Sequence, residues 1–108
     1  MQILITIDLS QADLPAFDHY EAQVLPLLAL YGGAIIFRLR ATDDRSEFHL
    51  LQFPDADAFA AYKADPRRTA LASLWQASGA TATTTPVTRL GSGPIKLLAL
   101  RSMQGSMK

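Results

Sequence analysis

Residues 34–53 read AIIFRLRATDDRSEFHLLQF, and this stretch decides the fold. Two runs rich in apolar and aromatic residues, 34–41 and 46–53, flank the polar loop Thr42-Asp43-Asp44-Arg45. Such runs are typical of strands, and a polar four-residue loop between them is typical of a hairpin. The stretch therefore predicts two antiparallel strands joined by a short turn.

A loop at residues 42–45 also predicts the register of this hairpin, with Arg40 opposite Glu47 and Arg38 opposite His49. Opposite residues share a face of the sheet. We expect the more apolar face to pack on helices and the charged face to be left bare. The expected helix-packing face holds Ile3, Ile5, Ile7, Ile35, Phe37, Leu39, Phe48, Leu50 and Gln52. The expected bare face holds Ala34, Ile36, Arg38, Arg40, Glu47, His49, Leu51 and Phe53.

The segments around the hairpin complete an alternating pattern. Residues 2–9 have strand period, and a helix follows with Ser10 or Asp13 as its N-cap, a kink at Pro26 and an end at Gly32-Gly33. A second helical segment begins at Asp55, restarts at Asp65-Pro66 and closes at Gly79, before an edge strand over residues 80–88. The order βαββαβ predicts an α+β ferredoxin-like plait, a four-stranded antiparallel sheet with two helices on one face.

Residues 1–90 form the predicted domain, and residues 91–108 form a C-terminal tail. The tail opens with Gly91-Ser92-Gly93-Pro94, which favours a change of direction. Residues 95–100 are apolar, and we expect them to add a fifth strand or to pack across a dimer partner.

Composition narrows the function classes. Ten basic and ten acidic residues give a net charge of zero, so no basic field favours nucleic acid or an anionic membrane. The chain has no cysteine, which excludes thiolate catalysis and sulfur-ligated metals. The apolar run at the start of the sequence is too short, and reaches a charged residue, Asp8, too early, for a signal peptide or a membrane span. We therefore expect a cytoplasmic protein.

The predicted bare face is apolar at one end, through Leu4, Ala34, Ile36, Leu51 and Phe53. Pairing this face with the same face of a second copy would cover it. We therefore expect a homodimer through the sheet.

Two segments resemble a known family. FDHYEAQVLPLLALYGG (17–33) is similar to the first helix of the DUF1330 family, and FPDADAFAAYKADPRR (53–68) is similar to its second helical segment. The resemblance covers residues 1–89 and implies a dimeric α/β barrel, in which two plaits pack sheet against sheet. Relatives in that superfamily include small monooxygenases, haem-degrading enzymes, lactone isomerases and stress-response proteins. The Asn, Trp and His of the haem-degrading relatives cannot be carried over, since this chain has Trp75 but no Asn.

The charged end of the hairpin carries the candidate site. Arg38 and Arg40 offer planar donors for an anion or carbonyl group, and His49 can move a proton near neutral pH. Thr6 and Asp8 are expected on the same face from the neighbouring strand, and a carboxylate that orients a histidine favours base chemistry. The candidate catalytic residues are His49, Arg38 and Asp8, and the candidate ligand-binding residues are Arg38, Arg40, His49 and Thr6. The alternative is a solvated ladder of cross-strand pairs, with Asp8 a strand-end residue.

Two functions remain open. One is a homodimer that binds a small ligand without catalysis, and the other is a cofactor-free monooxygenase or isomerase acting on a small aromatic or oxo substrate. We expect no cofactor and no metal, because the two histidines lack metal-ligand spacing. A His49 ring that points into a closed cavity of ligand size would favour the enzyme.

Overall fold

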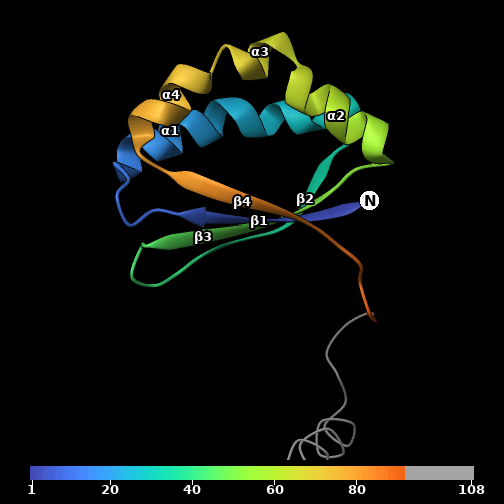
Figure 1. The fold of residues 1–108 in the computed structure, drawn as a ribbon, viewed down its shortest axis with the longest axis horizontal. Helices are drawn as coiled ribbons and strands as arrows, with labels where there is room; N and C mark the ends of the chain where they lie inside the picture. Colours follow the sequence, from blue (N-terminus) through green and yellow to red (C-terminus); the bar gives the residue numbers. More distant parts are fainter. Residues whose placement is uncertain (92–108) are drawn as a thin grey trace, which may run out of the picture.

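Four antiparallel strands form one sheet in the order β2-β3-β1-β4, and helices cover one face of it (Figure 1). The computed structural model describes residues 1–91. The predicted α+β ferredoxin-like plait is confirmed. Its elements are β1 (Gln2–Asp8), α1 (Leu14–Val24), the 3-10 helix η1 (Leu25–Tyr31), β2 (Ala34–Arg40), β3 (Ser46–Gln52), α2 (Ala56–Ala64), α3 (Pro66–Thr69), α4 (Ala72–Ser78) and β4 (Thr81–Val87).

Local sequence signals set the limits of the first helical segment. Asp13, not Ser10, caps α1, and its side chain accepts a hydrogen bond from the backbone N–H of Ala16 at 3.1 Å. The α-helix ends at Val24 and the 3-10 helix η1 begins at Leu25, so the helix type changes one residue before Pro26, where the sequence predicts a kink. Gly32 then ends η1 with a φ of 67°, a left-handed conformation that favours glycine.

The second helical segment is divided into three short helices. Asp55 caps α2 and Asp65 caps α3, as the two Asp residues of the sequence predict. Gly79 ends α4 with a φ of 77°, and a Cβ there would lie 2.5 Å from the carbonyl oxygen of Gln11. Only glycine fits this close approach, which brings the start of β4 beside the start of α1.

The hairpin has the predicted register over its outer half. Arg40 pairs with Glu47, Arg38 with His49 and Phe37 with Leu50. An irregularity at Ile36 then shifts the register, so that Ile35 pairs with Leu51. This bulge moves Ile35 to the face that Leu51 occupies and leaves Ile36 42% exposed.

The predicted assignment of the two hairpin faces is wrong. In β1, Ile3 pairs with Leu51, Ile5 with His49 and Ile7 with Glu47, so these side chains share one face. That face is the one under the helices, because its side chains are buried or partly buried. The residues expected on the bare face but found under the helices are Arg38, Arg40, Glu47, His49, Leu51 and Phe53.

The physical reason is that the charges on this face compensate one another. Glu47 is 1% exposed and lies between two arginines, and Asp18 also pairs with Arg40, so two carboxylates and two guanidinium groups form a unit with almost no net charge. Ile3 and Ile7 of β1 supply the apolar surface beside it and bring Leu51 and Phe53 into the core. The face of a strand that is buried depends on its neighbours, and the hairpin alone does not determine it.

The face away from the helices is therefore more apolar than predicted. Leu39 is 56% exposed and Phe37 is 37% exposed on this face, and they pair with the half-buried Phe48 and Leu50. Leu4 lies on the same side of the sheet, opposite Leu50.

The C-terminal tail and the question of membrane-spanning helices can be addressed only within the described residues. Residues 95–100, predicted to add a fifth strand or to pack across a dimer partner, lie outside the described residues. Within residues 1–91, none of the helices has the length and apolarity needed to cross a lipid bilayer.

Candidate functional site

The carboxylate of Glu47 on β3 is the centre of a buried polar cluster. Its Oε1 accepts a hydrogen bond from Nε of Arg40 at 2.8 Å, and its Oε2 accepts one from Nε of Arg38 at 3.0 Å. The same Oε2 lies 2.6 Å from Nε2 of His49, two residues further along the strand. Arg40 also reaches Asp18 on α1 at 2.7 Å. The hydrogen bond between Nε2 and Glu47 thus orients the imidazole of His49.

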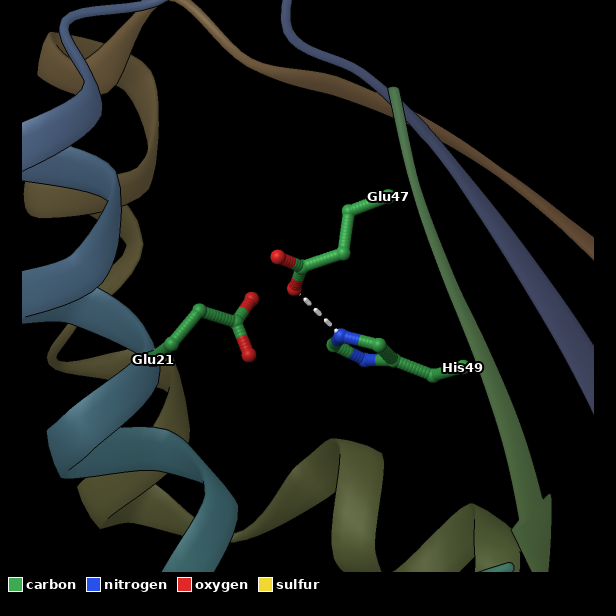
Figure 2. A group of neighbouring side chains, drawn as sticks. All are labelled: Glu21, Glu47 and His49. Atoms are coloured by element: carbon green, nitrogen blue, oxygen red, sulfur yellow. Dashed lines mark hydrogen bonds and ion pairs between the residues drawn. The ribbon is translucent and has the colours of Figure 1, made fainter. Parts of the chain in front are cut away.

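Glu21 on α1 completes the cluster from the helix layer. Figure 2 shows its carboxylate facing Glu47 and the ring of His49. One ligand atom from each of the three residues lies within 4.8 Å of the others, and all three residues are buried. Oε2 of Glu21 is buried without a hydrogen-bond partner in the described part of the chain. Glu21 is therefore a buried acid with unused hydrogen-bonding capacity.

The surroundings raise the pKa of one of these three groups and lower the pKa of the other two. Burial raises the pKa of Glu21 to about 7, and the neighbouring Arg38 offsets this only in part. Burial also opposes the charge of Glu47, but hydrogen bonds from His49 and Arg38 outweigh it and lower the pKa of Glu47. Burial lowers the pKa of His49, although Glu47 acts in the opposite direction. At neutral pH the cluster holds a charged Glu47, a neutral His49 and a Glu21 near its midpoint.

His49 and Glu21 both line a cavity of about 390 Å³ between the sheet and the helices. This volume suits a small organic molecule. Ile5 and Leu51 contribute apolar wall from the sheet, and Trp75 contributes aromatic wall from α4. The cavity is only partly enclosed, and the exposed β4 forms one of its edges.

A second space, a groove of about 650 Å³, lies on the other side of Glu21, between α1 and β2. Glu47, Arg38 and Arg40 line this groove, whereas His49 lines only the cavity. Glu21 lines both spaces and therefore stands between the polar groove and the cavity.

The donor set of Glu21, Glu47 and His49 is one that a divalent cation could use. The sequence did not indicate it, because its members come from two distant elements. Both oxygens of Glu47 already accept hydrogen bonds from Arg38, Arg40 and His49. A metal ion would have to displace these donors and lie beside two cations, so the arrangement fits the sharing of protons better than the binding of metal.

The structure brings together some predicted site residues and separates others. Arg38, Arg40 and His49 meet at Glu47, on the helix side of the sheet. Thr6 and Asp8 lie on the opposite face, where Thr6 pairs with Phe48 and Asp8 with Ser46. Hydrogen bonding by the side chain of Ser10, and then by its backbone N–H at 2.8 Å, lowers the pKa of Asp8. The expectation that Asp8 and Thr6 accompany His49 is wrong, because they share the face of Leu4 and not that of Ile5.

Glu21 is the member that sequence reasoning missed, although the sequence carries a signal for it. It lies four residues after Phe17 and three before Val24, on the apolar stripe of α1. A carboxylate on a buried stripe is unusual unless it has a partner or a function. The rings of Tyr20 and Trp75 pack together with centroids 5.2 Å apart, and both residues line the cavity.

Solved structures of the same fold include an oxygenase. The chain matches SnoaB, a cofactor-independent oxygenase from Streptomyces nogalater, with a TM-score of 0.69 and 21% identity over 86% of this chain and 96% of that one. An antibiotic biosynthesis monooxygenase matches with a TM-score of 0.52 and 16% identity, over 82% of this chain and 100% of that one. RPA0582, a protein of unknown function from Rhodopseudomonas palustris, matches with a TM-score of 0.58 and 15% identity over 82% and 84%.

At these identities the matches establish the fold alone, which this chain shares with a cofactor-independent oxygenase and with an antibiotic biosynthesis monooxygenase. No family model and no curated protein sequence matches the chain, so the narrower resemblance to DUF1330 stays a resemblance.

Proposed function

We propose that this protein is a cofactor-free monooxygenase that removes a proton from carbon in a small aromatic or oxo compound. The observation that carries the proposal is the buried His49, which Glu47 orients at 2.6 Å and which lines a cavity of ligand size. Proton abstraction from a carbon next to a carbonyl needs a neutral base, an acid near the oxygen and little water at the base. The cavity is partly open rather than closed, but His49 itself is only 3% exposed.

His49 has the protonation state of a base. An ionised carboxylate only accepts hydrogen bonds, so Nε2 of His49 carries the proton that it donates to Glu47. The lone pair of a neutral ring is then on Nδ1, which makes no hydrogen bond to the residues described. When Nδ1 takes a proton from the substrate, the imidazolium is stabilised by the carboxylate of Glu47 beside it.

Glu21 can supply the acid. With a pKa of about 7, a large fraction of its side chain is protonated at neutral pH. A protonated carboxyl donates a hydrogen bond, and Oε2 of Glu21 has no partner within residues 1–91. A substrate carbonyl placed between Glu21 and His49 would meet a donor at its oxygen and a base at the adjacent carbon.

The oxygenation balances without an external reductant. The substrate CH₂ group loses one proton to His49, and the carbanion passes its electrons to O₂, forming a carbon-bound hydroperoxide after protonation. Loss of the second C–H proton then breaks the O–O bond, so that the carbon becomes C=O and the other oxygen atom leaves as water. The cofactor-independent oxygenase of the same fold supports this reaction class. Return of the proton to a different carbon would instead make the protein an isomerase.

The proposal is tested by proton exchange on a model ketone. The wild-type protein in D₂O without oxygen is expected to accelerate exchange of the α-protons of 2-tetralone, followed by ¹H NMR. His49→Gln should lose at least about 100-fold of this rate, the usual contribution of a general base. His19→Gln is the matched control, because His19 is exposed on α1 and its side chain bonds only Gln23 among residues 1–91.

Two results would contradict the proposal. One is a wild-type exchange rate equal to that of buffer, and the other is equal activity of the two histidine variants. Ligand binding without exchange would favour the non-catalytic binding protein that the sequence left open.

We also propose that two copies pair through the sheet face that the helices leave uncovered. Its exposed Phe37 and Leu39, with Leu4 and the half-buried Phe48 and Leu50, support this pairing. Apolar side chains on the uncovered face of a sheet are stabilised when a second sheet excludes water from them.

Light scattering at micromolar concentration tests the pairing. The wild type is expected near twice 11.8 kDa. Leu39→Glu should give the monomer mass, because it places a charge in the centre of the interface while Leu39 has no role in the core. Gln76→Glu, on the exposed surface of α4, is the control and should stay dimeric. A folded wild-type monomer would refute the dimer.

A further inference from the structure

Two cations line the cavity without an ion-pair partner within residues 1–91. Lys63 at the end of α2 and Arg68 in α3 both line the cavity. Neither forms an ion pair with a carboxylate of the described chain, whereas Arg38, Arg40 and Arg67 each do. Because the chain as a whole has no net charge, two cations without an acidic partner are a local excess of positive charge.

Arg68 is held in place and still has a donor to spare. Its guanidinium lies over the ring of Tyr62, 5.1 Å from the centroid, and Nη1 reaches the carbonyl oxygen of Lys63 at 3.5 Å. Its Nε is buried and has no hydrogen-bond partner in the part of the chain that the structure describes. A buried N–H without an acceptor is costly, and a bound ligand would satisfy it.

Four aromatic side chains also line the cavity. Tyr20 and Trp75 lie in contact on one side, and Phe59 and Tyr62 line it from α2. Lys63 lies over the ring of Phe59, 4.4 Å from its centroid. The cavity lining therefore combines two cations, aromatic rings and the acid–base pair of His49 and Glu21.

We infer that the cavity takes an aromatic ligand that bears an anionic oxygen group, which Arg68 binds with the help of Lys63. This inference rests on the proposed function and adds the charge of the substrate to it. Arginine is suited to the task, since its planar donors match a carboxylate or phenolate. The charge of Glu47 does not repel such a ligand strongly, because Arg38 and Arg40 already offset it.

A matched pair of probes tests the charge alone. 1-Naphthoate and 1-naphthamide have almost the same shape, and only the first is an anion. The chain has one tryptophan, and it lines the cavity, so the shift of the Trp75 indole N–H signal in NMR reports binding at this place. The wild type is expected to bind 1-naphthoate about tenfold more tightly than 1-naphthamide, the effect of one charge-assisted hydrogen bond.

Arg68→Gln should remove this preference and leave the affinity for 1-naphthamide within about twofold. Arg45→Gln is the control, because Arg45 lies in the exposed hairpin loop and should not alter either affinity. Equal affinity of the wild type for both probes, a preference that survives Arg68→Gln, or no shift of Trp75 with either probe would overturn the inference.

These outcomes are separate from the test of the reaction. The naphthalene probes are measured without turnover, and His49→Gln should still prefer 1-naphthoate. Loss of the Arg68 preference together with intact exchange on 2-tetralone would leave the proposed reaction standing. A preference for the anion in a protein that catalyses no exchange would leave the anion site standing and remove the reaction.

Discussion

Glu21→Gln is expected to stabilise the folded protein at pH 8 and to have little effect near pH 5. Burial raises the pKa of Glu21 from 4.5 to about 7, so the folded protein holds this proton more tightly than the unfolded chain does. The stability that this group contributes is present below pH 4.5 and is lost as the pH rises through 7. Glutamine has nearly the same shape and no charge to bury.

The expected gain at pH 8 is up to about 3 kcal/mol in the free energy of unfolding, from the size of the pKa change. Urea unfolding of both proteins between pH 5 and pH 8 measures it, and the difference between them should grow with pH. His49 has the opposite effect on stability, because its lowered pKa favours the folded state as the pH rises. His49 is present in both the variant and the wild type, so this effect cancels in the difference between them.

Asp18→Asn is the control for this experiment. Asp18 lies on the same helix but is half exposed, and its pair with Arg40 is at the surface. We expect a change below about 1 kcal/mol at both pH values. If Glu21→Gln changed the free energy of unfolding equally at pH 5 and pH 8, burial would not raise the pKa of Glu21.

Glu47→Gln should destabilise the protein at neutral pH by about 3 kcal/mol, near the lower end of what breaking a buried ion pair costs. The amide cannot accept from Arg38, Arg40 and His49 together, and its NH₂ group would face donors. Arg38 and Arg40 retain some access to water, with 40% and 27% of their side chains exposed, which limits the loss.

Thermal and urea unfolding at pH 7 measure this loss. The hydrogen bonds that lower the pKa of Glu47 against the effect of burial stabilise the wild type above the unfolded pKa, and this stabilisation disappears as the pH falls through the folded value. The gap between wild type and variant should therefore narrow in acid. A Glu47→Gln protein as stable as Asp18→Asn at pH 7 would contradict the description of Glu47 as the centre of the cluster.

Short-range signals in the sequence account for most of the fold. The polar loop at residues 42–45 predicts the pairing of Arg40 with Glu47 and of Arg38 with His49, because hairpin geometry is local. Asp13, Asp55 and Asp65 mark helix starts for the same reason, and Gly32 and Gly79 mark ends.

The candidate site could be predicted only in part, because it depends on contacts between distant elements. The sequence places Arg38 and His49 side by side but does not say whether helices or solvent cover them. The partner that settles this lies in β1, where Ile5 pairs with His49. Glu21 reaches the cluster from a helix, and no spacing within one element reveals that contact. The bulge at Ile36 could not be predicted either, because a bulge is recognised only when the strand pairing on both of its sides is known.

The protonation of His49 tests the central claim most directly, because the proposed base requires a neutral ring with its proton on the nitrogen bonded to Glu47. ¹⁵N NMR of the two histidines as a function of pH measures this, with His19→Gln to assign the signals. We expect His49 at pH 7 to carry its proton on Nε2 and a lone pair on Nδ1, and to titrate below the ordinary value of 6.5. A doubly protonated ring at pH 7, or a proton on Nδ1, would contradict the account.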